Sequence, residues 1–439
     1  MLNFVSFFFV LSFFFLFNNW WYFLIFMLFF YPFFFLYNFD LSFMSKNMFV
    51  CLDNFSFCLI VLTFWIIFLS IFSSTYLISD YYSSYFLLVF WMLMIFLFFF
   101  FVVSNFFFFF FFFESTLFPT FFLILGWGNN YERMFSGFYL FFYTLFSSMP
   151  MLLSIFYILN SNNSGLFMFM DLNFGCLNLI YFFLIISFLV KMPMFLVHSW
   201  LPKAHVEAPV SGSMILAGVL LKMGGYGIFR LSFMFKYFFS LSLIWIYISI
   251  WGGLVSSFIC LRQIDLKSLI AFSSVAHMSL VIIGLLIFFD LGIIGSLMLM
   301  FAHGLCSSGM FYLANIVYER SGTRSLFLNK GLMSIFPSLS LWWFLLCSFN
   351  MAAPPSLNLI SEIFLFSGVT SWSFILVFIL MFFSFIGGAY NLFLFTFVNH
   401  GKVFSSLNFF NPCYIREYYI LFLHMLPISF MFLKLEVFY

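Results

Sequence analysis

The stretch from Lys191 to Gly227 reads KMPMFLVHSWLPKAHVEAPVSGSMILAGVLLKMGGYG, and it decides how the rest of the chain is interpreted. Strongly apolar sequence flanks it on both sides, yet it contains three lysines, two histidines, a glutamate and three prolines. A charged group at the centre of a bilayer costs about 2.5–3.5 kcal/mol on insertion scales. Charges beside helix-breaking prolines in such a setting predict a hydrated path for ions or protons.

The composition predicts an all-α protein that crosses a membrane many times. Of its 439 residues, 66% are hydrophobic and only 6% are charged. Long apolar runs between short polar links favour helices, because the strands of a membrane barrel would alternate polar and apolar residues. No cleavable signal peptide is apparent, and the links are too short for a soluble domain of useful size. We therefore expect a single membrane domain over residues 1–439, surrounded by membrane lipids and without a nucleic-acid partner.

We count about fourteen membrane segments. They lie near 2–17, 20–37, 55–78, 84–104, 105–125, 132–159, 174–197, 208–230, 239–261, 267–289, 291–318, 338–368, 371–397 and 417–433. Two segments are interrupted, one by Pro193 after Lys191 and the other by Pro354-Pro355 before Glu362. Paired broken helices in two halves of a chain are typical of an inverted-repeat transporter. We expect a first half-channel repeat over about 84–230, a second over about 239–397, and a C-terminal helix within 398–439.

The basic residues predict the orientation of the chain in the membrane. Links after odd-numbered late segments hold seven of them: Arg262, Lys267, Arg320, Arg324, Lys330, Lys402 and Arg416. Links after even-numbered late segments hold two, Arg230 and Lys236. Because positive links stay on the cytoplasmic or matrix side, the richer set is expected to face that compartment.

Lys191 and Lys222 are the strongest candidates for proton transfer. A buried lysine can lose several pKa units through desolvation, so it can bind and release a proton near neutral pH where a surface lysine cannot. The alternative is a lysine that snorkels to the membrane interface. Glu132, which opens the segment near 132–159, either complements a helix dipole or stands near Lys191 and holds that lysine protonated.

Other candidates are carboxylates and histidines within apolar sequence. Glu362 is a lone carboxylate eight residues after the first proline of the second break. Glu114, at the end of a run of eight phenylalanines, is either a relay group or a structural hydrogen-bonding residue. His277 and His303 each lie among serines able to carry water, which favours a proton relay. Haem ligation would need facing pairs of histidines, and each of these segments offers only one.

A further polar group follows Lys191 directly. His198, Lys203, His205 and Glu207 form either the mouth of the path or a capped link between helices. Pro202 separates the two histidines and argues against one continuous metal-binding helix face. The seven cysteines have no zinc or iron–sulfur spacing, and no nucleotide-binding or nucleophile–base motif is present. We therefore expect no metal and no cofactor in this chain.

These motifs resemble those of a known family. The central stretch is similar to the chain 4 family of the mitochondrial proton-pumping NADH:ubiquinone oxidoreductase, respiratory complex I, whose chain 4 is an antiporter-like membrane-arm subunit. The resemblance includes GNNYERMFSGFYLFFYT upstream and SSVAHMS, FAHGLCSSGMFYLAN, YERSGTRS and MAAPPSLNLISE downstream. It runs in register from roughly residue 50 to 400, and the first fifty residues lie outside it.

The resemblance implies a proton relay that consists of Glu132, Lys191, Lys222, His277, His303 and Glu362. In that family the glutamate of the ER motif and the lysine before MP act as a coupled pair, here Glu132 and Lys191. Lys222 would be the central relay residue, and Glu362 would be the outlet-side group.

The resemblance also implies in which membrane the chain lies and which subunits surround it. The chain would lie in the mitochondrial inner membrane with its positive links on the matrix side, beside sister antiporter-like subunits. It would be part of a translocase without holding a redox centre, since NADH, FMN, iron–sulfur clusters and ubiquinone would bind partner subunits. Two other functions stay open, namely a cation/proton antiporter subunit without redox coupling and a purely structural spacer.

Overall fold

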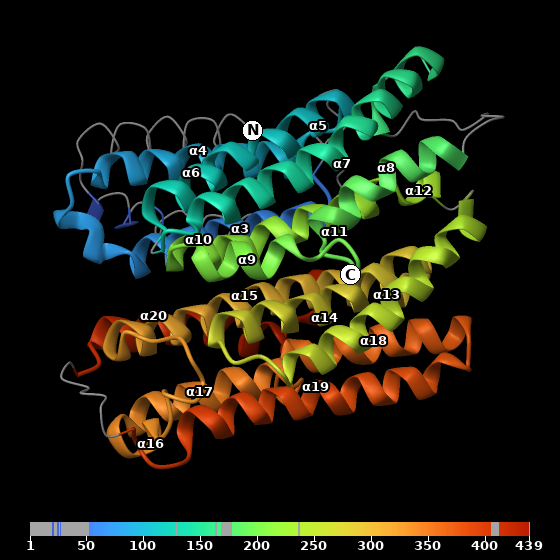
Figure 1. Ribbon diagram of the computed structural model, residues 1–439. Helices are drawn as coiled ribbons and strands as arrows, with labels where there is room; N and C mark the ends of the chain where they lie inside the picture. The colour runs from blue at the N-terminus through green and yellow to red at the C-terminus, as the bar shows by residue number, and fades with distance from the viewer. Residues whose placement is uncertain are drawn as a thin grey trace.

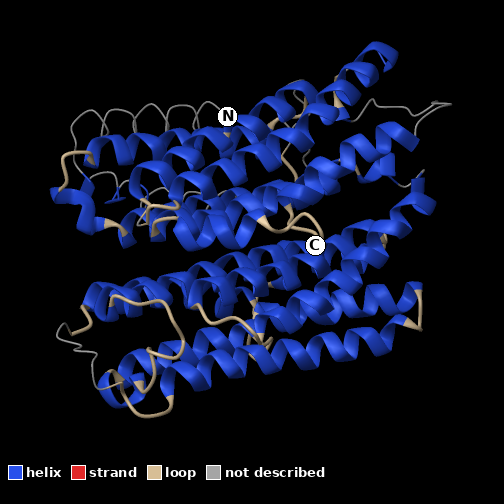
Figure 2. Cartoon of the chain, in the orientation of Figure 1, coloured by secondary structure: helices blue, strands red, loops and turns tan. Residues whose placement is uncertain are grey.

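Helices form most of the chain in the computed structural model (Figures 1 and 2), which describes residues 20, 21, 24, 25, 27, 52–128, 130–162, 165–167, 178–235, 238–404 and 412–438. Within these ranges no strand forms, and nine helices are long and apolar enough to cross a membrane. The predicted class, an all-helical polytopic membrane protein, is confirmed. Lys236, the expected segment near 2–17 and most of that near 20–37 lie outside the described residues, so the total of fourteen stays a prediction.

The helices before residue 236 occupy one side of the molecule in Figure 1. They are α3 (Asn54–Ser73), η1 (Thr75–Ser79), α4 (Ser83–Val102), α5 (Phe106–Ser115), α6 (Leu117–Trp127), α7 (Arg133–Asn162), α8 (Asn178–Lys191), α9 (Trp200–Glu207), α10 (Val210–Ile215), the π-helical turn η3 (Leu216–Leu220), α11 (Leu221–Arg230) and α12 (Ser232–Phe235).

Most of the later helices lie on the other side in Figure 1. They are α13 (Phe239–Cys260), α14 (Leu266–Leu286), α15 (Asp290–Ser321), α16 (Leu332–Ile335), α17 (Pro337–Asn350), α18 (Leu357–Trp372), α19 (Leu376–Asn399), α20 (Ile415–Met431) and η5 (Leu435–Phe438).

Both expected breaks are present. α8 ends at Lys191 and α9 begins only at Trp200, while α17 ends at Asn350 and α18 begins at Leu357. Proline lacks a backbone N–H and its ring clashes with the preceding turn, so a helix ends near it. Each break therefore places charged or polar side chains where the helical backbone stops.

The expected single segment near 105–125 carries a smaller interruption. α5 and α6 together make a membrane span from Phe106 to Trp127, but they are separated at Thr116. Pro119 explains this, because it offers no N–H to the carbonyl oxygen four residues earlier, that of Ser115. The irregular turn lies directly after Glu114.

The helices that bear Lys222, His277 and His303 are strongly enclosed. In the apolar stretch of α14, 94% of the residues are buried within the molecule. The same share holds for the span Val210–Arg230. The corresponding share is 33% for α19 and 39% for α7, whose outer faces carry exposed phenylalanines. The candidate residues on α11, α14 and α15 therefore lie in the interior of the bundle.

The molecule has two polar ends, and α3 runs between them. Asp53 pairs with Arg230 just before α3, and Thr75 accepts a hydrogen bond from Arg416 just after it. The 20 residues of α3 cover about 30 Å, the thickness of the hydrocarbon core of a bilayer. The two ends therefore belong on opposite sides of the membrane.

Hydrogen bonds join the loops at the Arg416 end, which we call the basic end. They are Leu266 N to Arg324 O at 3.0 Å, Leu326 N to Ile264 O at 2.8 Å, Gly331 N to His400 O at 3.3 Å and Arg320 Nη2 to Pro412 O at 3.2 Å. The seven basic residues expected on one side of the membrane thus lie in or beside loops of this end.

Candidate proton-transfer site

Lys191 is buried at the end of α8, where its amine meets α5. Its Nζ atom donates to the carbonyl oxygen of Phe113 at 2.5 Å and lies 3.2 Å from the centroid of that ring. The carboxylate of Glu114, the next residue, has both oxygens buried and acts electrostatically on Lys191. Glu114 is near the middle of its membrane span. Lys191 and Glu114 therefore form a buried acid–base pair.

The expected pairing of Glu132 with Lys191 is wrong. Glu132 is an exposed residue in the turn before α7. The span that carries Glu114 ends at Trp127, 13 positions after it, which corresponds to about 20 Å of helix, and Glu132 follows that end. The ER motif therefore belongs to the end of the bundle, and the carboxylate beside Lys191 is Glu114.

Lys222 lies in the centre of the bundle, next to an irregular turn. The residues just before it form the π-helical turn η3, and π turns are frequent at functional sites. Its Nζ atom donates to the backbone carbonyl of Ala217 within this turn and lies 3.3 Å from Nδ1 of His303. The side chain is wholly buried, so the interface-snorkelling alternative does not hold for Lys222.

A row of titratable side chains continues from Lys222 across three helices. The rings of His303 on α15 and His277 on α14 have centroids 5.4 Å apart. Nδ1 of His277 lies 3.8 Å from Oε1 of Glu362 on α18, and both side chains are largely buried. A distance of 3.8 Å exceeds that of a direct hydrogen bond but fits a contact bridged by one water.

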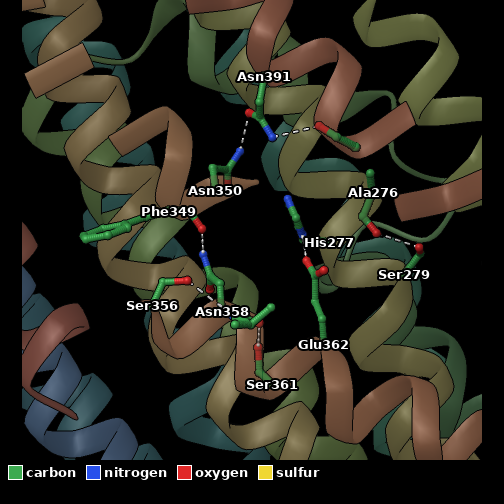
Figure 3. A network of polar contacts seen from close by, with 12 residues as sticks. Ala276, His277, Ser279, Phe349, Asn350, Ser356, Asn358, Ser361, Glu362 and Asn391 are labelled. Carbon is green, nitrogen blue, oxygen red and sulfur yellow. Dashed lines mark hydrogen bonds and ion pairs between the residues drawn. The ribbon is translucent and has the colours of Figure 1, made fainter. Parts of the chain in front are cut away.

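The second break holds the end of this row in place (Figure 3). Asn350, the last residue of α17, donates from Nδ2 to Oδ1 of Asn391 at 2.8 Å. Asn358 donates across the break to the carbonyl oxygen of Phe349 at 2.7 Å. One turn after Asn358, the carboxylate of Glu362 points toward His277. Asn350 thereby joins α17 to α19 and Asn358 joins α18 to α17, one turn before Glu362.

Sequence reasoning missed Tyr390. Its hydroxyl lies 3.1 Å from Nε2 of His277, so that ring has a polar neighbour on each nitrogen. Nothing in the sequence distinguishes Tyr390 from other tyrosines in apolar helices, because its partner lies 113 positions away.

The accessory candidates do not form one cluster. His198 stacks on Phe195, and Lys203 is an exposed residue whose amine lies 3.7 Å from the ring centroid of Tyr139. His205 and Glu207 are buried near the start of α10. Only the last two of the four candidates therefore line the interior.

Lys267 was expected in an exposed basic link, but it is 3% exposed and packs near His205 and Glu207. Lys267 is the second residue of α14, and because such a place at a helix start is usually exposed, no signal in the sequence indicated its burial. Across the described ranges, no group of three or more histidine, cysteine, aspartate or glutamate side chains is placed to hold a metal ion.

Comparisons with known proteins agree with this geometry. A family model described as NADH:quinone oxidoreductase/Mrp antiporter, TM, matches residues 103–387, and one described as NADH-ubiquinone oxidoreductase chain 4, amino terminus, matches residues 1–100. The chain is 49% identical over 407 residues to NADH-ubiquinone oxidoreductase chain 4 of Ceratitis capitata, covering 92% of this chain and 91% of that protein. The corresponding protein of Aedes aegypti is 56% identical over 323 residues, covering 73% and 72%.

Two solved structures share the fold. A chain of respiratory complex I from Thermus thermophilus superimposes with a TM-score of 0.79 at 21% identity, covering 87% of this chain and 81% of that one. A chain of the Mrp complex from Dietzia gives a TM-score of 0.75 at 15% identity, covering 81% and 68%.

Proposed function

The chain belongs to the NADH-ubiquinone oxidoreductase chain 4 family, and we propose that its buried row of lysine, histidines and glutamate moves protons across the membrane. The observation that supports this most strongly is the succession Lys222, His303, His277 and Glu362, with 3.3 Å, 5.4 Å and 3.8 Å between neighbouring groups or rings. Each of these side chains can bind and release a proton, and buried ionisable groups in membrane helices are typical of proton relays.

The energy requirement fits such groups. Moving one elementary charge against 100 mV costs about 2.3 kcal/mol. Since one pKa unit corresponds to about 1.36 kcal/mol, each group has to change its proton affinity by roughly two pKa units per step. Buried lysines and carboxylates have this range, because burial and a neighbouring charge act on them in opposite directions.

Glu114 takes the place we expected for Glu132 in this proposal. When Glu114 is charged, Lys191 keeps its proton, and separation of the pair releases the proton toward Lys222. The end of α8 and helix α11, which carry the two lysines, pack closely, because Gly224 lies directly against the backbone of Phe188 and Met192. Glu132 stays a predicted relay residue without a structural contact that supports it.

The proposed setting is the membrane arm of a redox-driven proton pump in the mitochondrial inner membrane. Sister antiporter-like subunits would be its neighbours, and partner subunits would bind NADH, FMN, iron–sulfur clusters and ubiquinone. We propose that residues 84–230 and 239–397 act as two half-channels, with the basic end in the matrix, as the positive-inside rule predicts.

A native gel of the source membrane, solubilised in mild detergent and stained for NADH oxidation, tests this setting. We expect mass spectrometry to find the chain in a very large NADH-oxidising band. The chain in a smaller assembly without NADH oxidation would contradict redox coupling. Sodium-dependent transport by that assembly would then identify an antiporter.

A further inference from the structure

A second buried polar cluster lies at the start of α10, near the basic end. Lys267, the second residue of α14, donates at 3.2 Å to the backbone carbonyl of the residue after Glu207. Glu207 acts electrostatically on Lys267, and its Oε1 atom accepts from Asn130 Nδ2 at 3.1 Å. Arg324 donates at 2.6 Å to the backbone carbonyl of the residue before Glu207. The basic end is thereby tied directly to this cluster.

Three buried atoms of the cluster have no hydrogen-bond partner among the described residues. They are Nδ1 and Nε2 of His205 and Oε2 of Glu207. His205 is wholly buried and stacks on Phe311, with ring centroids 4.6 Å apart and planes 8° from parallel. Buried polar atoms without a protein partner are the positions that ordered water occupies in proteins. The cluster therefore offers ordered water three polar atoms on two titratable groups, beside the amine of Lys267.

The cluster lies between the basic end and the relay. Along α15, Phe311 is nine residues before Arg320 and eight after His303, which correspond to about 13 Å and 12 Å of helix. His205, stacked on Phe311, is thus midway between the aqueous end and His303. Along α14, Lys267 lies ten residues before His277, a distance of about 15 Å. The same two helices carry both the cluster and the relay.

We propose that Glu207, Lys267 and His205 form an inlet through which protons pass from the basic end to His303 and Lys222. A proton bound by the carboxylate of Glu207 moves to the amine of Lys267. It then passes through water to one ring nitrogen of His205, while the other ring nitrogen releases a proton toward His303. Only N–H and O–H bonds change. This inference rests on the proposed function and adds an inlet separate from the pair of Glu114 and Lys191.

Lys267→Arg is the most informative variant, because arginine keeps the positive charge beside Glu207 but does not release a proton near neutral pH. In inverted membrane vesicles that contain the assembled enzyme, we expect NADH-driven proton uptake to fall to the level of Lys222→Met. His205→Gln, which keeps a hydrogen-bonding side chain, should give the same loss. Lys402→Met removes an exposed lysine at the same end and should pump like the wild type.

Native gels show whether each variant assembles. The rate of NADH oxidation with a soluble electron acceptor shows whether the partner subunits stay active. Wild-type pumping by Lys267→Arg would overturn the inlet, since the lysine would then contribute only its charge. If Lys267→Arg pumps like the wild type while Lys222→Met loses pumping, the inlet is overturned but the relay is supported. Wild-type pumping by Lys222→Met would overturn the proposed function itself.

Discussion

At the scale of single residues, depth along a helix decides which charge reaches the relay. Glu114 and Glu132 are both glutamates close to an interrupted helix, but only Glu114 lies at the level of Lys191. A buried charge without a partner is strongly destabilising, whereas an exposed one is solvated by water. The two residues therefore have different tasks, and their local sequences differ accordingly, since Glu114 follows eight phenylalanines whereas Glu132 follows Asn129, Asn130 and Tyr131.

This difference predicts the outcome of a matched pair of substitutions. Glu114→Gln keeps the shape of the side chain but removes the charge that faces Lys191, so we expect proton pumping to fall by about tenfold or more. Glu132→Gln should retain pumping close to that of the wild type. NADH-driven acidification of inverted vesicles, at equal amounts of assembled enzyme, measures both. A large loss of pumping in Glu132→Gln with little loss in Glu114→Gln would contradict this assignment and identify Glu132 as the partner of Lys191.

Much of the candidate site could be predicted from sequence for one physical reason. Ionisable residues are costly in lipid, so Lys191, Lys222 and Glu362 stand out in apolar segments. The partner of each was harder to predict, because a shift of a few residues in a helix boundary moves a side chain by several ångströms. Lys267 shows this directly, since its place at a helix start suggested an exposed link.

At the scale of helices, the backbone at the end of α8 packs closely on α11, the helix that carries Lys222. A Cβ atom at Gly224 would lie 2.7 Å from the carbonyl oxygen of Phe188 and 2.9 Å from the backbone nitrogen of Met192. Backbone atoms cannot rotate away as a side chain can, so the contact requires glycine. Gly224 and Gly227, which follow Lys222 in the sequence, thus set the spacing of α11 from the end of α8.

Gly224→Ala is therefore expected to destabilise the chain, by about 1–3 kcal/mol on the scale of overpacked cores. Gly126→Ala is the matched control, because a Cβ at Gly126 meets nothing within 4 Å. The measurement is the fraction of enzyme that stays assembled on native gels after incubation at increasing temperature. Equal thermal loss in the two variants would contradict the packing argument.

The breaks after α8 and α17 were predictable. The side-chain contacts that join the helices at the second break were not. Pro193 and Pro354-Pro355 mark the places where the helices stop. The side chains that join the helices at the second break, such as Asn350 with Asn391, lie 41 positions apart in the sequence. Tertiary contacts of this kind leave no local periodicity, which is why Tyr390 and the asparagine pair emerged only from the structure.

At the scale of the whole molecule, two polar ends enclose an interior with a chain of titratable groups. The composition already implied a polytopic helical protein, since backbone polar groups in lipid must be satisfied within helices. The proposed inlet starts near Arg324 at the basic end, and the relay reaches Glu362 through three helices. Transport across the membrane then requires every group between them to change its proton occupancy.

Lys222 is the group on which these steps converge, so its substitution tests the central claim most directly. The measurement is NADH-driven proton uptake by inverted vesicles that contain Lys222→Met at a normal amount of assembled enzyme. Methionine fills the volume of the lysine chain without a proton-binding group, so we expect uptake below about a tenth of the wild-type rate. Proton uptake at the wild-type rate in the assembled variant would contradict the relay.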